Sequence, residues 1–303
     1  MPSHYVSRRI LRTASAVTLA LGTGLAAPFL LAGTADADTP SATAAFSASD
    51  HAILYTAASG QTNKVTVTAS KSGGSEEITY VIDDEVPVSA GDGCSHPDGA
   101  DDTKVSCTVA TLESQDPYAT LKLALGDGDD TVAYDNTTDQ TYYFASADLG
   151  DGKDTAIHTG GVDGNSVRGR AGDDNLSVGV AGVVGGGDGD DTLHATDGSI
   201  AQGGNDNDTI YSDGEDSAVD GGAGNDVIQG GAERQNLSGG DGNDTIRGGT
   251  GNDVLYGGTG NDVLYGNSGD DTIYGNSGDD ELYGGPGRDT LSGGPGRNIV
   301  HQD

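Results

Sequence analysis

The chain has few of the residues from which an ordinary globular core is built. Its 303 residues include no Trp, one Met and three Phe, and 14 Lys plus Arg face 48 Asp plus Glu, which gives a formal charge of −34 at pH 7. Low hydrophobicity with high net charge is typical of disorder, because little apolar surface offsets the entropy lost on ordering. The alternative is a repeat fold whose charge is neutralised by cations.

Basic residues are too few, and too scattered, to form a stripe on one face. Phosphate groups would be repelled by such a surface, which argues against a nucleic-acid partner. Divalent cations are the partners that this acidity favours.

The motifs of common hydrolases are also missing. The sequence contains no H-E-x-x-H and no G-x-S-x-G, and its six His are scattered. Acidic residues are so abundant that a pair of carboxylates says nothing about glycoside hydrolysis. We therefore predict no catalytic residues and no enzymatic activity. The alternative is a secreted hydrolase, of glycosidase, lipase or protease type, with an unrecognised active site.

The first residues have the three parts of a secretory signal peptide. Three Arg lie between positions 8 and 12, an apolar stretch covers 14–31, and Ala-Asp-Ala occupies 35–37. We predict a signal peptide over 1–37 and a secreted, extracellular protein, with the Sec and Tat routes both open. An uncleaved anchor is the alternative, because the apolar stretch is nearly long enough to span a bilayer. Nothing later in the sequence could span one.

The only two cysteines, Cys94 and Cys107, lie in a chain predicted to enter an oxidising compartment. A single disulfide that closes a short loop is the favoured interpretation, since a metal site would need more ligands.

A segment with sparse glycine follows a predicted linker at 38–44. Alternating or β-branched runs predict strands at 64–68, 77–82, 104–109 and 119–125. We interpret 45–124 as a small β domain that caps one end of a stacked fold, because terminal units of such folds need a cap.

Glycine and aspartate dominate from residue 125 to 301. Positions 239–301 divide without a gap into the nonapeptides GGDGNDTIR, GGTGNDVLY, GGTGNDVLY, GNSGDDTIY, GNSGDDELY, GGPGRDTLS and GGPGRNIVH, and looser copies begin at positions 125, 149, 169, 186, 203 and 221. A fixed short period is the signature of a solenoid.

These units resemble the RTX, or hemolysin-type, nonapeptide G-G-x-G-x-D-x-U-x, in which U is a large apolar residue. The resemblance implies an all-β fold, a right-handed parallel β-roll or β-solenoid with the small N-terminal β domain as cap. It also implies that each unit is a six-residue turn followed by a three-residue strand, that two units make one coil, and that Ca²⁺ ions lie between stacked turns.

Calcium suits this pattern because it takes six to eight oxygen ligands. Glycines let backbone carbonyls approach an ion, and the Asp at the sixth place of each turn adds carboxylate oxygen. Turns that stack every eighteen residues predict two columns of metal ligands. The first column is Asp130, Asp154, Asp174, Asp191, Asp208, Asp226, Asp244, Asp262 and Asp280, and the second is Asp253, Asp271 and Asp289.

Adjacent pairs predict up to eight calcium sites in the first column and two in the second. The second column stops upstream because Gln235 and Ser217 take the sixth place, and Asn298 takes it in the last unit. The stacked aspartates of a column should repel one another until cations lie between them, so we expect folding to follow calcium binding. A metal-free solenoid and a disordered polyanion are the alternatives.

The Tyr that recur every nine residues from 256 to 283 are interpreted as strand packing.

RTX toxins and hydrolases usually carry a separate activity domain and a C-terminal export signal, whereas this chain has a predicted N-terminal signal. The resemblance therefore implies calcium binding alone. Cell-wall or other extracellular polymers are possible partners in a structural or adhesive role.

Overall fold

The computed structural model describes residues 40–71, 76–112, 117–138, 140, 142–159 and 165–302. All of them belong to one compact unit, Thr39–Asp303. The described residues form β-strands, turns and bends, with no helix among them. It follows that this part of the chain also holds no helix that could cross a bilayer. The predicted signal peptide, 1–37, lies outside the described residues.

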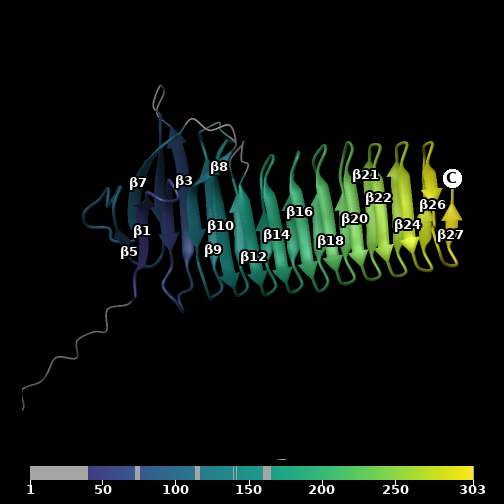
Figure 1. Ribbon diagram of the computed structural model, residues 1–303, viewed down its shortest axis with the longest axis horizontal. Helices are drawn as coiled ribbons and strands as arrows, with labels where there is room; N and C mark the ends of the chain where they lie inside the picture. Colours follow the sequence, from purple (N-terminus) through teal and green to yellow (C-terminus); the bar gives the residue numbers. More distant parts are fainter. Residues whose placement is uncertain are drawn as a thin grey trace, which may run out of the picture. The chain divides into compact units, whose positions relative to one another are not determined.

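From residue 118 onward the chain alternates between two parallel sheets, and each pass adds one strand to each sheet (Figure 1). In the 13-stranded sheet these strands are β8 (Tyr118–Ala124), β10 (Tyr143–Asp151), β12 (Ser166–Ala171), β14 (Val183–Asp188), β16 (Ile200–Asn205), β18 (Ala218–Ala223), β20 (Asn236–Asp241), β22 (Val254–Thr259), β24 (Thr272–Ser277) and β26 (Thr290–Ser292).

In the 14-stranded sheet they are β9 (Thr131–Asn136), β11 (Thr155–His158), β13 (Asn175–Ser177), β15 (Thr192–Ala195), β17 (Thr209–Ser212), β19 (Val227–Gly230), β21 (Thr245–Thr250), β23 (Val263–Ser268), β25 (Glu281–Tyr283) and β27 (Ile299–His301). The predicted parallel β-solenoid is confirmed. Strands β20 to β24 have six residues each rather than three, because ladder pairing continues into the first residues of the following turn.

The N-terminal strands continue both sheets and form the strands at one end of each. They are β1 (Ala42–Ser47), β2 (Ala52–Thr56), β3 (Lys64–Lys71), β4 (Glu77–Asp83), β5 (Val88–Ala90), β6 (Cys94–Ser95) and β7 (Lys104–Ala110). Strand β2 pairs in parallel with β8, and β3 pairs in parallel with β9. Beyond them β1, β4, β7 and β6 pair antiparallel, which ends the parallel ladders.

The four strands predicted in this region are present as β3, β4, β7 and β8. Strand β1 begins at Ala42, inside the predicted linker 38–44. The disulfide is present, since Cys94 and Cys107 are bonded across the β6–β7 pair with Cα atoms 4.1 Å apart. Because both sheets run through residue 124 without a break, a separate cap domain stays a prediction.

The core is a row of single apolar residues from each strand. Ile228, Ile246, Leu264 and Leu282 point inward from the 14-stranded sheet, and Leu237, Leu255 and Ile273 from the other, all fully buried. Side chains alternate across a strand, so the residues on either side of each inward position face outward. Burial of one such side chain contributes roughly 1.5 to 3 kcal/mol, which leaves the core thin for the length of chain it orders.

Close stacking of turns explains why glycine cannot be replaced at several places. A Cβ added to Gly260 would lie 1.7 Å from the carbonyl oxygen of Gly242, and its φ of 126° suits only glycine. Asn replaces glycine at positions 267 and 276, where φ is 69° and 67°. Asn tolerates this left-handed region better than most residues.

The tyrosines stack on one another along the outer faces. Ring centroids of Tyr256 and Tyr274 are 5.3 Å apart, and those of Tyr265 and Tyr283 are 4.9 Å apart, with interplanar angles of 11° in both pairs. His301 continues the second stack at 4.6 Å. Each of these rings therefore has a face covered by a neighbouring ring, which agrees with a packing role.

We expect Gly260→Ala to destabilise the calcium-loaded protein far more than Gly198→Ala. Both glycines have positive φ, but a Cβ at Gly198 would meet nothing within 4 Å. The Gly198 change should cost about 1 to 2 kcal/mol from backbone strain alone, whereas the Gly260 change must also separate two turns. Chemical denaturation of both variants in excess calcium measures the difference. Equal losses would contradict the close-stacking argument.

Candidate metal centre

The aspartates predicted for the first column form one continuous ladder. The backbone N–H of Asp244 donates to Oδ1 of Asp262 at 2.9 Å, and the N–H of Asp262 donates to Oδ1 of Asp280 at 3.1 Å. The same bond joins each earlier pair in this column. The unequal spacings of 17, 20 and 24 residues do not interrupt it.

The second column forms a shorter ladder at the opposite edge. The N–H of Asp253 donates to Asp271 at 2.9 Å, and that of Asp271 donates to Asp289 at 3.0 Å. The structure thus brings together the residues of each predicted column, in the predicted order.

The second carboxylate oxygen of each column aspartate, Oδ2, has no such bond. In all twelve of these aspartates Oδ2 is buried and accepts no hydrogen bond. Eleven of the residues are at most 2% exposed, and Asp289, in the last complete turn, is partly buried. A buried, unpartnered carboxylate oxygen is costly unless a cation or donor balances it.

The first glycine of each turn leaves room beside this oxygen. A Cβ on Gly257 would lie 2.3 Å from Oδ2 of Asp262 and 2.7 Å from the carbonyl oxygen of Gly275 in the next coil. The corresponding glycines of neighbouring turns, such as Gly239 and Gly275, show the same crowding by Oδ2. Carboxylate and carbonyl oxygens of successive turns therefore converge on one place, and this is the donor set that calcium prefers.

The described residues contain no group of three or more His, Cys, Asp or Glu side chains placed to hold one ion. Each turn contributes a single carboxylate, so two stacked turns bring only two. Backbone carbonyls must supply the remaining ligands, which suits a hard cation such as calcium and suits zinc poorly.

A second ladder holds the fifth residue of each turn. The N–H of Asn243 donates to Oδ1 of Asn225, and that of Asn261 donates to Oδ1 of Asn243, at 2.9 and 2.8 Å. These bonds run toward the preceding coil, whereas those of the aspartate column run toward the following one. Each turn is therefore fixed from both sides, and the sixth residue is held in register.

Burial raises the pKa of every aspartate of the first column, and of Asp253 and Asp271, above the ordinary value, and neighbouring carboxylates add to the rise in most of them. The pKa reaches about 8 for Asp208, about 7 for Asp174 and Asp244, and about 6 for Asp130, Asp191, Asp262 and Asp271. Burial also raises the pKa of Asp154, Asp226, Asp253 and Asp280. Bonds from backbone N–H groups lower these pKa values in part. Without a metal ion the column resists carrying its full charge.

Two amide residues that the repeat motif does not identify share these features. Oδ1 of Asn63 and Oε1 of Gln235 are buried without a hydrogen-bond partner, and both residues are 1% exposed. Gln235 occupies the sixth place of its turn, and its N–H donates to Asp253 at 2.9 Å. The repeat pattern places Gln235 at the sixth position but predicts no ligand there, and it gives no sign of Asn63, because the motif requires Asp at that position.

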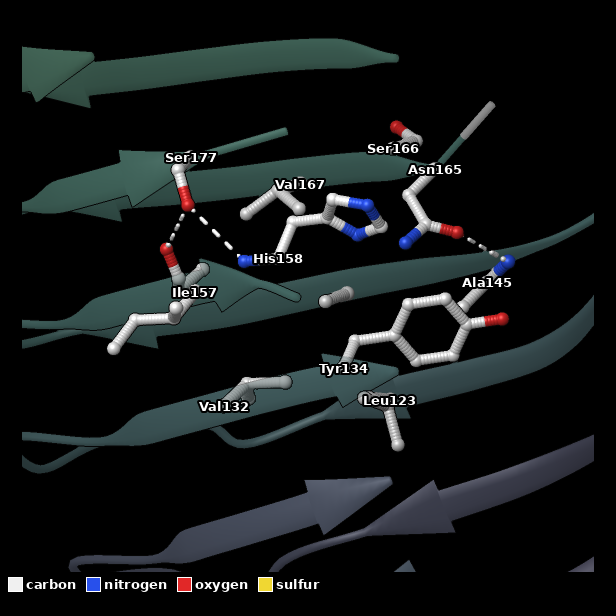
Figure 2. A pocket seen from close by; sticks show the side chains of 12 residues that line it. Leu123, Val132, Tyr134, Ala145, Ile157, His158, Asn165, Ser166, Val167 and Ser177 are labelled. Carbon is white, nitrogen blue, oxygen red and sulfur yellow. Dashed lines mark hydrogen bonds between the residues drawn. The ribbon is translucent and has the colours of Figure 1, made fainter. Parts of the chain in front are cut away.

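A hollow of about 20 Å³ inside the roll is lined by apolar side chains together with Asn165, His158 and Ser177 (Figure 2). The hydroxyl of Ser177 donates to the carbonyl of Ala156 and accepts the backbone N–H of His158, both at 3.1 Å. These are bonds between strands, and the hollow holds about one water molecule. It offers no room for the substrate of a hydrolase.

We expect the metal-free roll to become more stable as the pH falls from about 8 to about 4. The pKa of seven of these aspartates is raised above the unfolded value of 3.8, to between about 6 and about 8. Their contribution is therefore present below pH 3.8 and is lost as the pH rises through the folded values. The β-structure content in chelator at pH 4.5 and pH 8, followed by far-ultraviolet circular dichroism, measures this, with high salt to screen general repulsion. Equal β-structure content at both pH values would contradict it.

The comparisons with known proteins agree with this geometry. The family model of the RTX calcium-binding nonapeptide repeat matches residues 202–234, 238–273 and 265–300, in four copies. A comparison with curated proteins gives no match. The matched segments include the second column and the first column from Asp208 onward, whereas the four earlier aspartates lie outside them. RTX nonapeptide repeats bind multiple Ca²⁺ ions, and the matched part of the roll is built from such repeats, with Ca²⁺ as its cofactor.

Proposed function

We propose that this is a secreted protein whose roll folds around Ca²⁺ ions stacked between turns, and that it serves a structural or surface-interaction role outside the cell. The observation that carries the proposal is the set of twelve aspartates with one buried, unpartnered carboxylate oxygen each. A fold that collects so many uncompensated oxygens is stable only when cations balance them.

The twelve aspartates are the proposed side-chain ligands, and each ion lies between two aspartates that are adjacent in a column. The first column then provides eight calcium sites and the second provides two. The ladder bonds support this pairing, because they hold neighbouring aspartates at one constant register even where the sequence spacing changes.

Export and folding fit together in this proposal. The predicted signal peptide directs the chain out of the cell, where calcium is plentiful, and ion binding supplies the free energy that the thin core lacks. Before export, repulsion between the column aspartates disfavours the folded roll.

A surface-interaction role is supported by the outer face of the 13-stranded sheet. A hollow of about 570 Å³ lies there, and its lining includes Arg168, Gln202 and Gly185 together with the carboxylates of Asp151 and Asp188. Gly185 leaves the floor open, since a Cβ there would meet only one atom, 4.0 Å away. A polar hollow that holds both an arginine and carboxylates suits extracellular polymers rich in hydroxyl groups, and a cell-wall pull-down with and without chelator tests this role.

Calcium should induce β-structure in residues 38–303, and magnesium should not. Magnesium requires near-ideal octahedral geometry and gives up its waters reluctantly, so turns rich in carbonyl groups favour calcium. Far-ultraviolet circular dichroism during parallel titrations with both ions measures the effect. A spectrum unchanged by calcium would refute calcium-dependent folding.

Asp262→Asn should raise the calcium concentration at the folding midpoint on the order of tenfold, because calcium affinity depends on the charge of its ligands. The amide keeps an acceptor for the Asp244 N–H but removes the charge shared with the two adjacent places. Asp220→Asn is the matched control, since Asp220 is exposed on β18 and lies outside both columns. Equal shifts in the two variants would mean that net charge, and not ligation, sets the midpoint.

A further inference from the structure

The stacked turns do not begin with the repeats, because residues 58–63 form one more turn against residues 125–130. Strand β3 pairs with β9 so that Lys64 lies opposite Thr131, and Asn63 therefore takes the place next to Asp130. The N–H of Asn63 donates to Oδ1 of Asp130 at 2.6 Å, as the N–H of Asp130 donates to Oδ1 of Asp154 at 2.7 Å.

The carbonyl groups keep the same register across this junction. A Cβ on Gly128 would lie 2.3 Å from the carbonyl oxygen of Gln61, and a Cβ on Gly152 would lie 1.8 Å from that of Gly128. The carbonyl of Gln61 therefore lies against Gly128 in the same way as the carbonyl of Gly128 lies against Gly152. The junction repeats the backbone arrangement that lies between two calcium-binding turns.

The side chain of Asn63 places an oxygen at this junction without a hydrogen-bond partner. Its Nδ2 donates to Oδ2 of Asp84 at 2.7 Å and to the hydroxyl of Tyr55 at 3.2 Å. Its Oδ1 is buried and accepts no hydrogen bond. Leaving such an acceptor unpaired costs about 1 to 3 kcal/mol, which calls for a donor or a cation in the loaded protein.

Asp84 fixes which end of the amide faces the junction. Its carboxylate accepts from the Tyr55 hydroxyl, from Nδ2 of Asn63, and from the backbone N–H groups of Lys64 and Glu85 at 2.8 and 2.7 Å. A flipped amide would set its oxygen against this carboxylate, where two acceptors would repel each other. Oδ1 is therefore held away from Asp84.

We propose that a Ca²⁺ ion binds between the turn 58–63 and the turn 125–130, with Oδ1 of Asn63 and Oδ2 of Asp130 as its side-chain ligands. Amide and carbonyl oxygens are ordinary ligands of calcium, and Oδ2 of Asp130 is buried without a hydrogen bond. The inference rests on calcium binding by the roll and extends it to a turn outside the repeats.

This ion ties the N-terminal strands to the roll. Asn63 precedes β3 and Asp130 precedes β9, and the two residues are 67 positions apart in the sequence. One ion at their junction closes a long segment of chain, so calcium fixes the first repeat turn against the strands that end both sheets.

Diffraction from crystals of the calcium-loaded protein with Tb³⁺ exchanged for calcium tests this directly. The anomalous signal of Tb³⁺ should appear between Asn63 and Asp130 as well as between paired aspartates of the roll. Signal within the roll but none at Asn63 overturns the inference alone, whereas signal at neither place also overturns the proposed ligand columns.

Stoichiometry of the full chain gives a second test. Native mass spectrometry in calcium should show one ion fewer for Asn63→Leu than for the unchanged protein. Tyr80→Phe is the control, because it removes a buried hydrogen bond to Thr120 in the same region and leaves Asn63 intact. An unchanged ion count in Asn63→Leu overturns the inference. If that variant does not fold, the diffraction experiment on the unchanged protein decides.

Discussion

The mutual repulsion of buried carboxylates is the constraint on which the rest of this structure depends. Each coil places one or two aspartates directly over those of the previous coil, with one oxygen bonded to a backbone N–H and the other without a partner. Such an arrangement is unfavourable for a chain on its own. In the proposed function, calcium converts it into the interaction that holds successive turns together.

Most features of the turns follow from the need to bring oxygens close to an ion. Glycine at the first place makes room for the carboxylate, and glycine at the fourth place lets a carbonyl of the neighbouring coil approach where a Cβ would collide. The ladder at the fifth place, seen at Asn243 and Asn261, holds each turn against its neighbour. The strands can then be short and the core thin, because the edges carry much of the stabilisation.

The N-terminal strands solve a different problem of the same fold. A parallel ladder leaves an open edge, and open edges invite pairing with other chains. Here β1 and β4 pair antiparallel with the first coil strands β2 and β3, and the two sheets end at β5 and β6, which are only three and two residues long. Short edge strands offer little to pair with, and the disulfide fixes β6 to β7. Continuity of both sheets through this region places Asn63 directly in line with the first aspartate column.

The sequence by itself determined the repeat, the inward apolar residues, the disulfide and the two columns, because each depends on a periodic pattern or on a single possible pairing. The copies of the repeat motif around Asp130 and Asp154 were sufficient to place these residues in one column, although their spacing of 24 departs from the period of eighteen. Only the tertiary structure revealed Asn63 as a member of that column, since 67 residues separate it from Asp130 and no repeat surrounds it. It also decided that neighbouring tyrosine rings stack on one another, and that β2 and β3 pair with β8 and β9, the first strands of the roll. These features depend on which distant segments meet, and a local period carries no information about that.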